Sequence, residues 1–200
     1  LIKALGAELI LTPADENVDG AVRKAEEIAA SSDEYFMPQQ FENPANTDAH
    51  YKTTARELCE QLGKKIDIFV SGVGSGGTMA GIAKYLLEQN PDTKIIAAEP
   101  KGVSALLGQE PGLHQIQGIG DGFIPAILNP EIVTEVVEVS DEDAIATARE
   151  LAEVYGILCG TSSGANIYTA RKMAEKYGKD KVIATVLPDR AERYFSVGLF

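Results

Sequence analysis

The stretch that most constrains this chain runs from residue 66 to residue 90 and reads IDIFVSGVGSGGTMAGIAKYLLEQN. The apolar run at 66–70 predicts a buried strand, and apolar residues at helical spacing over 79–87 predict a helix. Glycines at 72, 74, 76 and 77 lie between them. Glycine lets the backbone approach an anion closely, and the first amides of a helix have no helical partner. The order of strand, glycine loop and helix therefore predicts a phosphate-binding cradle.

Strands and helices alternate through the rest of the chain. After a helix at 77–89, the pattern predicts strands at 94–98, 135–139 and 182–187, and helices at 141–155 and from 160–164 to Tyr177. This alternation predicts a three-layer α/β fold, in which helices cover both faces of a parallel sheet and ligands bind beyond the carboxyl ends of the strands. The connection from Glu99 to Pro130 is too apolar to be disordered, so we expect it to form an ordered wall of the site.

The beginning of the chain follows a different pattern. It predicts a helix end capped at Gly6, a strand at 7–11, a surface helix at 19–31, and a helix at 47–62 that stops at Gly63. The turn cluster Asn43-Pro44-Ala45-Asn46 separates this part from the regular alternation that follows. We therefore expect a domain boundary there, with one domain over residues 1–42 and a second over 43–200.

The composition excludes several classes of partner. With 30 acidic and 18 basic residues, the net charge of −12 argues against binding to nucleic acid or to an anionic membrane. The apolar runs have only strand length and no signal peptide opens the chain, so we expect a cytoplasmic protein. Cys59 and Cys159 lack metal-binding spacing, and His50 and His114 are the only histidines. No metal site is predicted.

The glycine loop alone permits more than one ligand. Gly72, Gly74 and Gly77 satisfy G-x-G-x-x-G, and Glu99 follows about twenty residues later, as in a dinucleotide-binding fold. An NAD-dependent dehydrogenase is therefore one alternative, and a loop that only packs a strand against a helix is another. Against the dinucleotide, Pro100 follows Glu99 directly, and the glycine cluster is denser than this fingerprint needs. So dense a cluster suits a single terminal phosphate better than a bridging pyrophosphate.

Seven segments together resemble the cysteine synthase (O-acetylserine sulfhydrylase) branch of the fold type II pyridoxal-phosphate enzymes. They occur in the order of that family and span nearly the whole chain: GAELILTP at 6–13, QQFENPAN at 39–46, HYKTT at 50–54, VGSGGTMAGIAKYL at 73–86, HQIQGIGDGFIP at 114–125, GILCGTSSGA at 156–165 and PDRAERYFS at 188–196. The resemblance implies a tryptophan synthase β-like fold. It makes residues 1–42 the C-terminal part of a smaller domain and 43–200 a larger domain that binds pyridoxal 5′-phosphate.

The resemblance also implies cofactor-binding residues. Ser162 would lie against the pyridine nitrogen, and the 5′-phosphate would be bound by the loop Gly74, Ser75, Gly76, Gly77 and Thr78. A neutral hydroxyl at Ser162 leaves the ring a weaker electron sink than a carboxylate would, which suits β-elimination better than transamination. Ser163, next in the chain, is expected to cap the helix that starts there.

Substrate-binding residues follow from the same resemblance. The second glutamine of the QQF segment, here Gln39 or Gln40 with Gln39 favoured by motif register, would lie at the substrate carboxylate. Gln117 and Gly118 would belong to the loop that closes over the bound amino acid.

Four positions depart from the family pattern: Ser75 for threonine, Thr161 for isoleucine, Asp121 for alanine and Ala191 for glycine. Alanine resists positive φ, so we expect an adjusted loop after Pro188.

The segments that carry the family's Schiff-base lysine, of type S-x-K-D-R, and its substrate-carboxylate loop, of type T-S-G-N-T-G, have no match in the 200 residues. Lys52 and Lys84 do not match the lysine position, and we expect both to be surface residues. The chain thus looks like the C-terminal two thirds of such an enzyme, with no catalytic residue of its own, and is expected to be inactive alone.

The activity that the resemblance implies is β-replacement, in which O-acetylserine and sulfide give cysteine and acetate through an aminoacrylate. Cystathionine β-synthase and an O-phosphoserine sulfhydrylase remain alternatives within the fold, and a catalytically dead binding fragment is an alternative outside enzymology. The resemblance further implies a homodimer and suggests the C-terminal tail of serine acetyltransferase as a partner.

Overall fold

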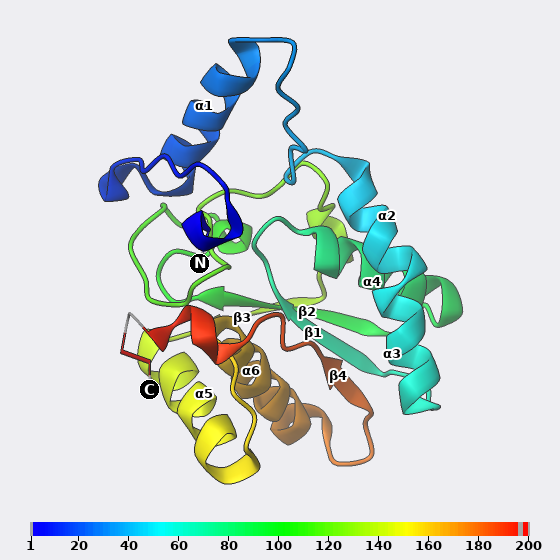
Figure 1. Cartoon of the computed structure of the whole chain (residues 1–200). Helices are drawn as coiled ribbons and strands as arrows, with labels where there is room; N and C mark the ends of the chain where they lie inside the picture. The colour runs from blue at the N-terminus through cyan, green and yellow to red at the C-terminus, as the bar shows by residue number, and fades with distance from the viewer. Residues whose placement is uncertain (1, 196–197, 200) are drawn as a thin grey trace. The chain divides into compact units, whose positions relative to one another are not determined.

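The computed structural model describes residues 2–195, 198 and 199 and contains two compact units, Leu1–Gln39 and Gln40–Phe200 (Figure 1). The division falls close to the boundary expected after residue 42. The assignment of residues 1–42 to the smaller domain of an enzyme stays a prediction.

The first unit contains one α-helix, α1 (Asn17–Ala30), and two short 3-10 helices, Lys3–Leu5 and Ala14–Glu16. Helix α1 corresponds to the surface helix predicted at 19–31. The strand predicted at 7–11 is wrong, because residues 7–13 pair with no strand among the described residues. Gly20 is the only described residue of this unit that is buried. The apolar side chains at 9–11 thus have no core here against which a strand could pack.

The second unit is built on a parallel sheet in the order β3-β2-β1-β4. Its strands are β1 (Ile68–Gly72), β2 (Lys94–Pro100), β3 (Glu135–Val139) and β4 (Ile183–Thr185). Strand β1 pairs with β2 on one side, with Phe69 opposite Ile95, and with β4 on the other. The strand that leads into the glycine loop is therefore central, and its side chains are buried over most of its length.

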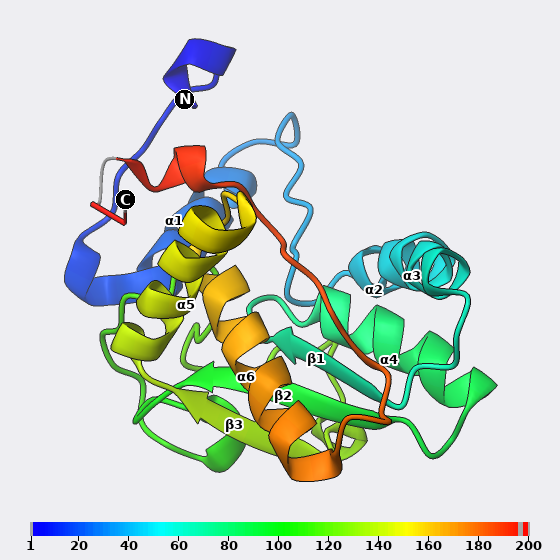
Figure 2. The same ribbon diagram turned by 90° about the horizontal axis from the view of Figure 1, so that it is seen from below.

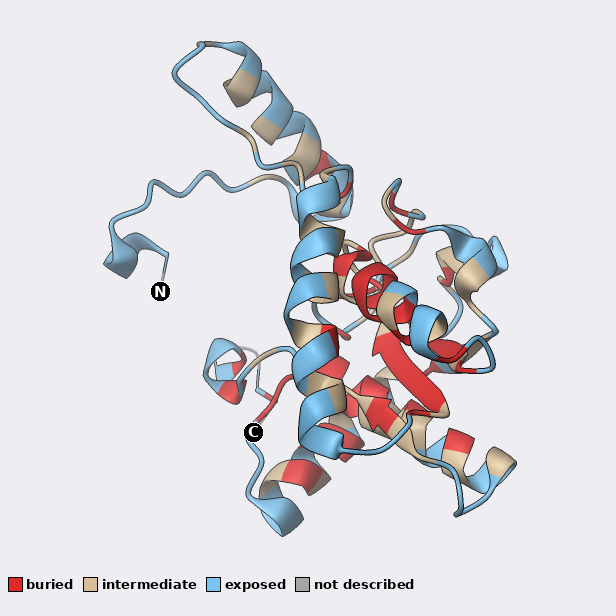
Figure 3. Cartoon of the chain, turned by 90° about the vertical axis from the view of Figure 1, so that its right-hand side faces the viewer, coloured by how far each residue is buried: buried red, intermediate tan, exposed pale blue. Residues whose placement is uncertain are grey.

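Side chains alternate between the two faces of this sheet, as the period of a strand requires. Phe69 and Ile95 pack with Met79 and Ile82 of the following helix, α4 (Gly77–Gln89). Their neighbours Ile68, Val70 and Ile96 pack instead with Met173 of α6 (Thr161–Tyr177). Buried residues gather in the strands and on the helix surfaces that meet them (Figure 3). The sheet is thus covered on both faces, and the predicted three-layer α/β fold is confirmed.

The remaining helices of this unit have clear start and stop signals. Helix α5 (Asp141–Tyr155) begins after Ser140, whose hydroxyl accepts a hydrogen bond from Asp143 N at 3.1 Å, and it lies beside α6 (Figure 2). The single helix predicted at 47–62 is in fact two, α2 (Pro44–Lys52) and α3 (Thr54–Leu62), which are separated by Thr53, whose φ of −117° and ψ of −78° are distorted from those of a regular helix. No helix in the described part of the chain has the length and apolarity needed to span a membrane.

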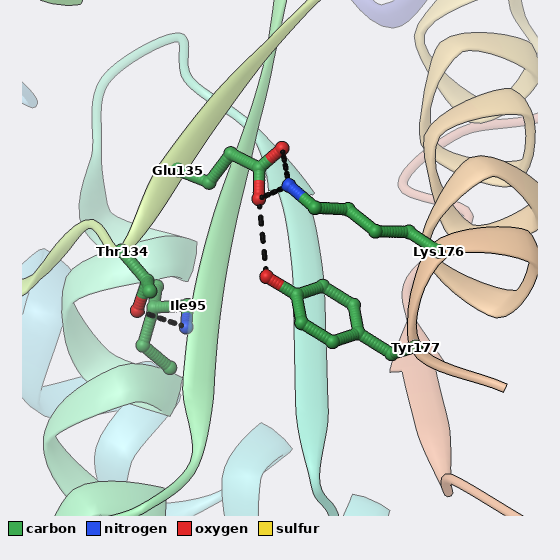
Figure 4. A network of polar contacts seen from close by, with 5 residues as sticks. All are labelled: Ile95, Thr134, Glu135, Lys176 and Tyr177. Carbon is green, nitrogen blue, oxygen red and sulfur yellow. Dashed lines mark hydrogen bonds and ion pairs between the residues drawn. The ribbon is translucent and has the colours of Figure 1, made fainter.

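A polar cluster ties the end of α6 to the start of β3 (Figure 4). Lys176 Nζ lies 2.7 Å from both carboxylate oxygens of Glu135, and the hydroxyl of Tyr177 donates to the same carboxylate at 3.3 Å. The preceding residue, Thr134, accepts a hydrogen bond from Ile95 N of β2 at 3.1 Å. The C-terminal end of α6 is therefore anchored at the edge of the sheet where β3 begins, opposite to the edge that holds the glycine loop.

Candidate functional site

One cavity of about 120 Å³ lies where β1 ends and α4 begins. It is lined by Ser71, Gly72, Gly74, Ser75, Gly76, Thr78, Met79, Gly118, Ile119, Ser162, Asn166, Val186 and Pro188. Six predicted site residues, which are distant in sequence, therefore share it: Gly74, Ser75, Gly76, Thr78, Gly118 and Ser162.

The other predicted residues lie elsewhere. Gly77 opens α4 without lining the cavity, and Gln117 lines a separate cavity of about 240 Å³ next to Thr161. Gln39 belongs to the first unit, where it has a positive φ of 52°.

The glycine loop and the loop at 118–120 are in backbone contact. A Cβ atom on Gly74 would collide with the carbonyl oxygen of Gly118, and Gly120 N donates a hydrogen bond to Val73 O at 2.9 Å. Gly76 has a φ of +83°, which residues other than glycine rarely adopt. These positions need glycine because two backbones must meet at the rim of the cavity.

Side chains of α2 hold both hydroxyl groups of the glycine loop. Asn46 Nδ2 lies 3.0 Å from Ser75 Oγ, and His50 Nε2 lies 3.1 Å from Thr78 Oγ1. The other ring nitrogen of His50 lies 3.0 Å from Thr54 Oγ1. Burial lowers the pKa of His50, which favours the neutral form of its ring. The sequence analysis gave neither α2 residue a role in the site, although Asn46 and His50 lie in two of the segments that resemble the family.

Helix α2 reaches this position because two glycines of α4 let it approach. A Cβ on Gly81 would lie 2.7 Å from His50 Cβ and 2.9 Å from Tyr51 N, and one on Gly77 would collide with the amide of Asn46. Glycines four residues apart on α4 thus face side chains four residues apart on α2. The close crossing of the two helices places Asn46 and His50 behind the loop.

The first turn of α6 forms the opposite side of the cavity. Gly160 is the N-cap and makes no side-chain cap, so the prediction that Ser163 caps this helix is wrong. Ser163 is buried inside the first turn, and its hydroxyl interacts with the Cys159 thiol. Ser162 lines the cavity, and its predicted contact with the pyridine nitrogen stays a prediction.

Asn166, one turn further along α6, was missed by the sequence analysis. Its side chain accepts a hydrogen bond from Gly72 N at 2.7 Å and donates one to Val186 O at 2.9 Å. It therefore fixes the end of β1 against the segment that follows β4.

Thr161 connects α6 to the loop that contains Gln117. Its hydroxyl accepts a hydrogen bond from Gln117 N at 3.0 Å and donates one to Gln115 O at 3.3 Å. In the same loop, His114 Nδ1 accepts from Ile116 N at 3.2 Å, so His114 Nε2 is the donor to Gly120 O at 3.0 Å. The part of the 99–130 connection next to the cavity is thus ordered by side-chain contacts.

The segment after Pro188 closes behind the start of α6. Asp189 accepts hydrogen bonds from Gly160 N at 3.3 Å and from the hydroxyl of Tyr194. Burial and the neighbouring carboxylate raise the pKa of Tyr194. Ala191 is buried at the start of a 3-10 helix and has no positive φ. Ala191 needs no positive φ here, and the expectation that this loop is adjusted relative to the family stays a prediction.

The chemistry of the cavity fits a phosphate group. The unpaired amides at the start of α4 and its helix dipole attract an anion, and the Ser75 and Thr78 hydroxyls offer further donors. None of the described residues that line the cavity is charged. The site can therefore hold an anionic group by amides and hydroxyls, and the hydroxyl of Ser162 is available to a ring extending from that group.

Comparison with known proteins agrees with this geometry. The family model described as pyridoxal-phosphate dependent enzyme matches residues 1–189. The chain belongs to this family. Pyridoxal phosphate, the cofactor predicted from the sequence, is the cofactor of the family.

Within this family, the chain is similar to cysteine synthases and to a cystathionine β-synthase. The chain is 48% identical over its whole length to a cysteine synthase of Staphylococcus aureus (strain Mu50 / ATCC 700699), and it spans 64% of the length of that relative. The crystal structure of an O-acetylserine dependent cystathionine β-synthase from Helicobacter pylori matches all of the chain with 42% identity and a TM-score of 0.93, and 65% of that structure is covered. A cysteine synthase from Entamoeba histolytica matches all of the chain with 42% identity and a TM-score of 0.91, and 59% of it is covered.

The dinucleotide alternative is wrong on two grounds. The family match is to pyridoxal-phosphate enzymes, and Glu99, which a dinucleotide fold would offer to a ribose, is 2% exposed. Its carboxylate instead accepts hydrogen bonds from Ser104 Oγ and from Leu106 N.

Proposed function

We propose that the protein catalyses a pyridoxal-phosphate-dependent β-replacement, in which O-acetylserine and sulfide give cysteine and acetate. The observation that carries the proposal is the single cavity that joins the glycine loop, the Ser162 hydroxyl and Gly118. The identity of 48% to a cysteine synthase along the whole chain supports the same reaction.

The residues of this chain would bind and orient the reactants. The loop from Gly74 to Thr78 would hold the cofactor phosphate, and Ser162 would hydrogen-bond the pyridine nitrogen without charging it. When bound, pyridoxal phosphate supplies a conjugated ring that accepts the electron pair left at the substrate α-carbon. Gln117 and Gly118 would cover the substrate, and Gln39 would contact its carboxylate.

The group that removes the α-proton is not among the residues of the cavity. Lys52 is exposed and pairs with Asp48 at 3.0 Å, and Lys84 lies over the ring of Tyr51. Both have the surface roles expected of them. These 200 residues expressed alone should therefore form no borohydride-trappable adduct with the cofactor and make no cysteine. A stoichiometric adduct on one lysine, together with activity, would contradict this.

Substrate comparison tests the proposed reaction. An intact enzyme that contains these residues together with the Schiff-base lysine, loaded with pyridoxal phosphate, should convert O-acetylserine and sulfide to cysteine faster than it uses O-phosphoserine with sulfide or serine with homocysteine. Mass spectrometry of the products measures each rate. Binding of NADH without binding of pyridoxal phosphate, or cofactor binding by the intact enzyme without turnover of any pair, would refute the proposal.

A cystathionine β-synthase activity is the second candidate. It is favoured by the Helicobacter pylori structure, whose O-acetylserine dependent enzyme matches the chain at a TM-score of 0.93. Offering sulfide and homocysteine in competition for O-acetylserine would separate the two, because cystathionine and cysteine differ in mass. A homodimer, a cytoplasmic location and docking of a serine acetyltransferase tail remain further proposals.

A further inference from the structure

Both hydroxyls of the glycine loop receive support from one helix. Asn46 and His50 lie four residues apart on α2 and therefore project from the same face. Their nitrogens lie 3.0 Å from Ser75 Oγ and 3.1 Å from Thr78 Oγ1. Since the two hydroxyls line the cavity, the direction of these hydrogen bonds decides what each hydroxyl can offer to an anion.

The hydrogen-bond partners of Asn46 fix that direction for Ser75. Asn46 Nδ2 lies 2.9 Å from the carbonyl oxygen of Gln40, which can only accept. The atom at this position is therefore the amide nitrogen, and its second proton goes to Ser75 Oγ. Because Ser75 Oγ already accepts this hydrogen bond, its own proton is free to be donated into the cavity.

His50 can complete the same arrangement for Thr78. A neutral ring donates from one nitrogen and accepts at the other. With the proton on Nε2, His50 donates to Thr78 Oγ1 and accepts from the hydroxyl of Thr54. With the proton on Nδ1, both bonds reverse and the Thr78 proton points at the ring. An anion in the cavity favours the first tautomer, because only then can Thr78 donate to it.

We propose that Asn46 and His50 set the hydrogen-bond polarity of the phosphate cradle. Each donates an N–H to a cradle hydroxyl, so Ser75 and Thr78 both direct their own protons at the oxygens of a phosphate monoester dianion. The two α2 residues are positioning residues, since they act on the anion only through the hydroxyls. The inference rests on the function proposed above, which places the cofactor phosphate in this cavity.

Binding measurements on α2 variants test the inference. Asn46→Ala removes one donor and should weaken binding of pyridoxal phosphate and of inorganic phosphate about fivefold. Asn46→Asp should cost about tenfold or more, because a carboxylate accepts the Ser75 proton and adds a negative charge behind the anion. His50→Phe should match Asn46→Ala, and His50→Gln, whose amide can still donate, should recover part of the loss.

Matched controls separate polarity from folding. Asp48→Asn changes an exposed side chain of α2 that pairs with Lys52 and should leave both affinities unchanged. Circular dichroism melting identifies any variant that has unfolded. Nitrogen-15 NMR of the His50 ring should show the proton on Nε2 when phosphate is bound, and this measurement needs no substitution.

Three outcomes decide the matter. The inference is supported if Asn46→Asp binds more weakly than Asn46→Ala, Asn46→Ala binds more weakly than wild type, and the loaded protein has the proton of His50 on Nε2. Equal affinities for folded Asn46→Asp and wild type, or an Nδ1–H tautomer with phosphate bound, overturn it. If the wild type binds neither pyridoxal phosphate nor inorganic phosphate, the proposed function itself fails, and the inference fails with it.

Discussion

At the scale of single residues, Glu99 shows how position in the fold changes the role of a side chain. It lies near the carboxyl end of β2, the edge of the sheet where ligands bind, yet it is buried. Burial raises the pKa of Glu99, and hydrogen bonds from Ser104 and Leu106 N oppose the increase only in part. The carboxyl therefore holds the start of the long connection in place instead of contacting a ligand.

The raised pKa of Glu99 predicts a pH-dependent effect of its replacement. The folded state holds this proton more tightly than the unfolded state, so the contribution of Glu99 to stability is lost as the pH rises above about 4.3. Glu99→Gln carries no charge. Its free energy of unfolding, measured with urea, should be close to wild type at pH 5 and higher by on the order of 1 kcal/mol at pH 8.

Glu150→Gln provides a control of opposite sign. Hydrogen bonds from Arg171 lower the pKa of the exposed Glu150, so the wild-type carboxylate stabilises the fold above its unfolded pKa and loses this effect as the pH falls. The free energy of unfolding of wild type should therefore increase relative to that of Glu150→Gln as the pH rises. A stability difference for Glu99→Gln that stays constant from pH 5 to pH 8 would show that Glu99 has an ordinary pKa.

At the scale of elements, the crossing of α2 and α4 controls the cradle. Gly77 and Gly81 remove the side chains that would otherwise separate the two helices. The sequence analysis assigned the glycines before α4 to anion binding and gave no role to Gly81. In the structure, Gly77 and Gly81 serve helix packing, and the packing in turn positions the side chains that hold the loop.

Gly81→Ala tests this crossing. The added methyl group meets backbone atoms of α2, so α2 has to shift, and such overpacking costs about 1–3 kcal/mol in the free energy of unfolding. The shift should also weaken phosphate binding. Ser140→Ala, which removes the N-cap of α5, should cost about 1 kcal/mol and leave binding unchanged. If Gly81→Ala keeps both stability and affinity, the close approach is not needed.

At the scale of the whole molecule, the part that could be predicted from the sequence is the part with strong local signals. Helix α4, helix α5 and strand β3 match their predicted bounds to the residue, because Gly76 precedes α4, Ser140 and Gly156 lie at the two ends of α5, and Ser140 also follows the last residue of β3. The break at Thr53 was not predictable, since neither glycine nor proline marks it. The strand expected at 7–11 failed because an apolar run forms a strand only beside a partner.

The candidate site shows the same limit. The positions Gly74, Ser75, Gly76, Thr78 and Ser162 were predicted because motifs in several segments resemble one family, and the structure brings these residues to one cavity, while their contacts with a cofactor stay predictions. Asn46, His50 and Asn166 were missed because their contacts join segments 28 to 94 residues apart in sequence. Such contacts depend on how helices cross, which no local pattern records.

The uncharged lining of the cavity has a consequence for how binding responds to ionic strength. Sites built on lysine or arginine lose affinity for anions as salt screens the attraction. Here the attraction comes from short hydrogen bonds and a helix end, while the chain as a whole carries a net charge of −12. Salt should screen mainly the long-range repulsion between the protein and a dianion.

Phosphate affinity should therefore stay constant or increase as the ionic strength is raised from about 0.05 to about 0.3 M. Equilibrium binding of pyridoxal phosphate across a sodium chloride series measures this dependence. A steep loss of affinity with increasing salt would show that a positively charged side chain contacts the bound phosphate. A flat or rising curve would identify a site that recognises phosphate through N–H and O–H groups directed at its oxygens. Such a site keeps its affinity for phosphate at high as well as at low ionic strength.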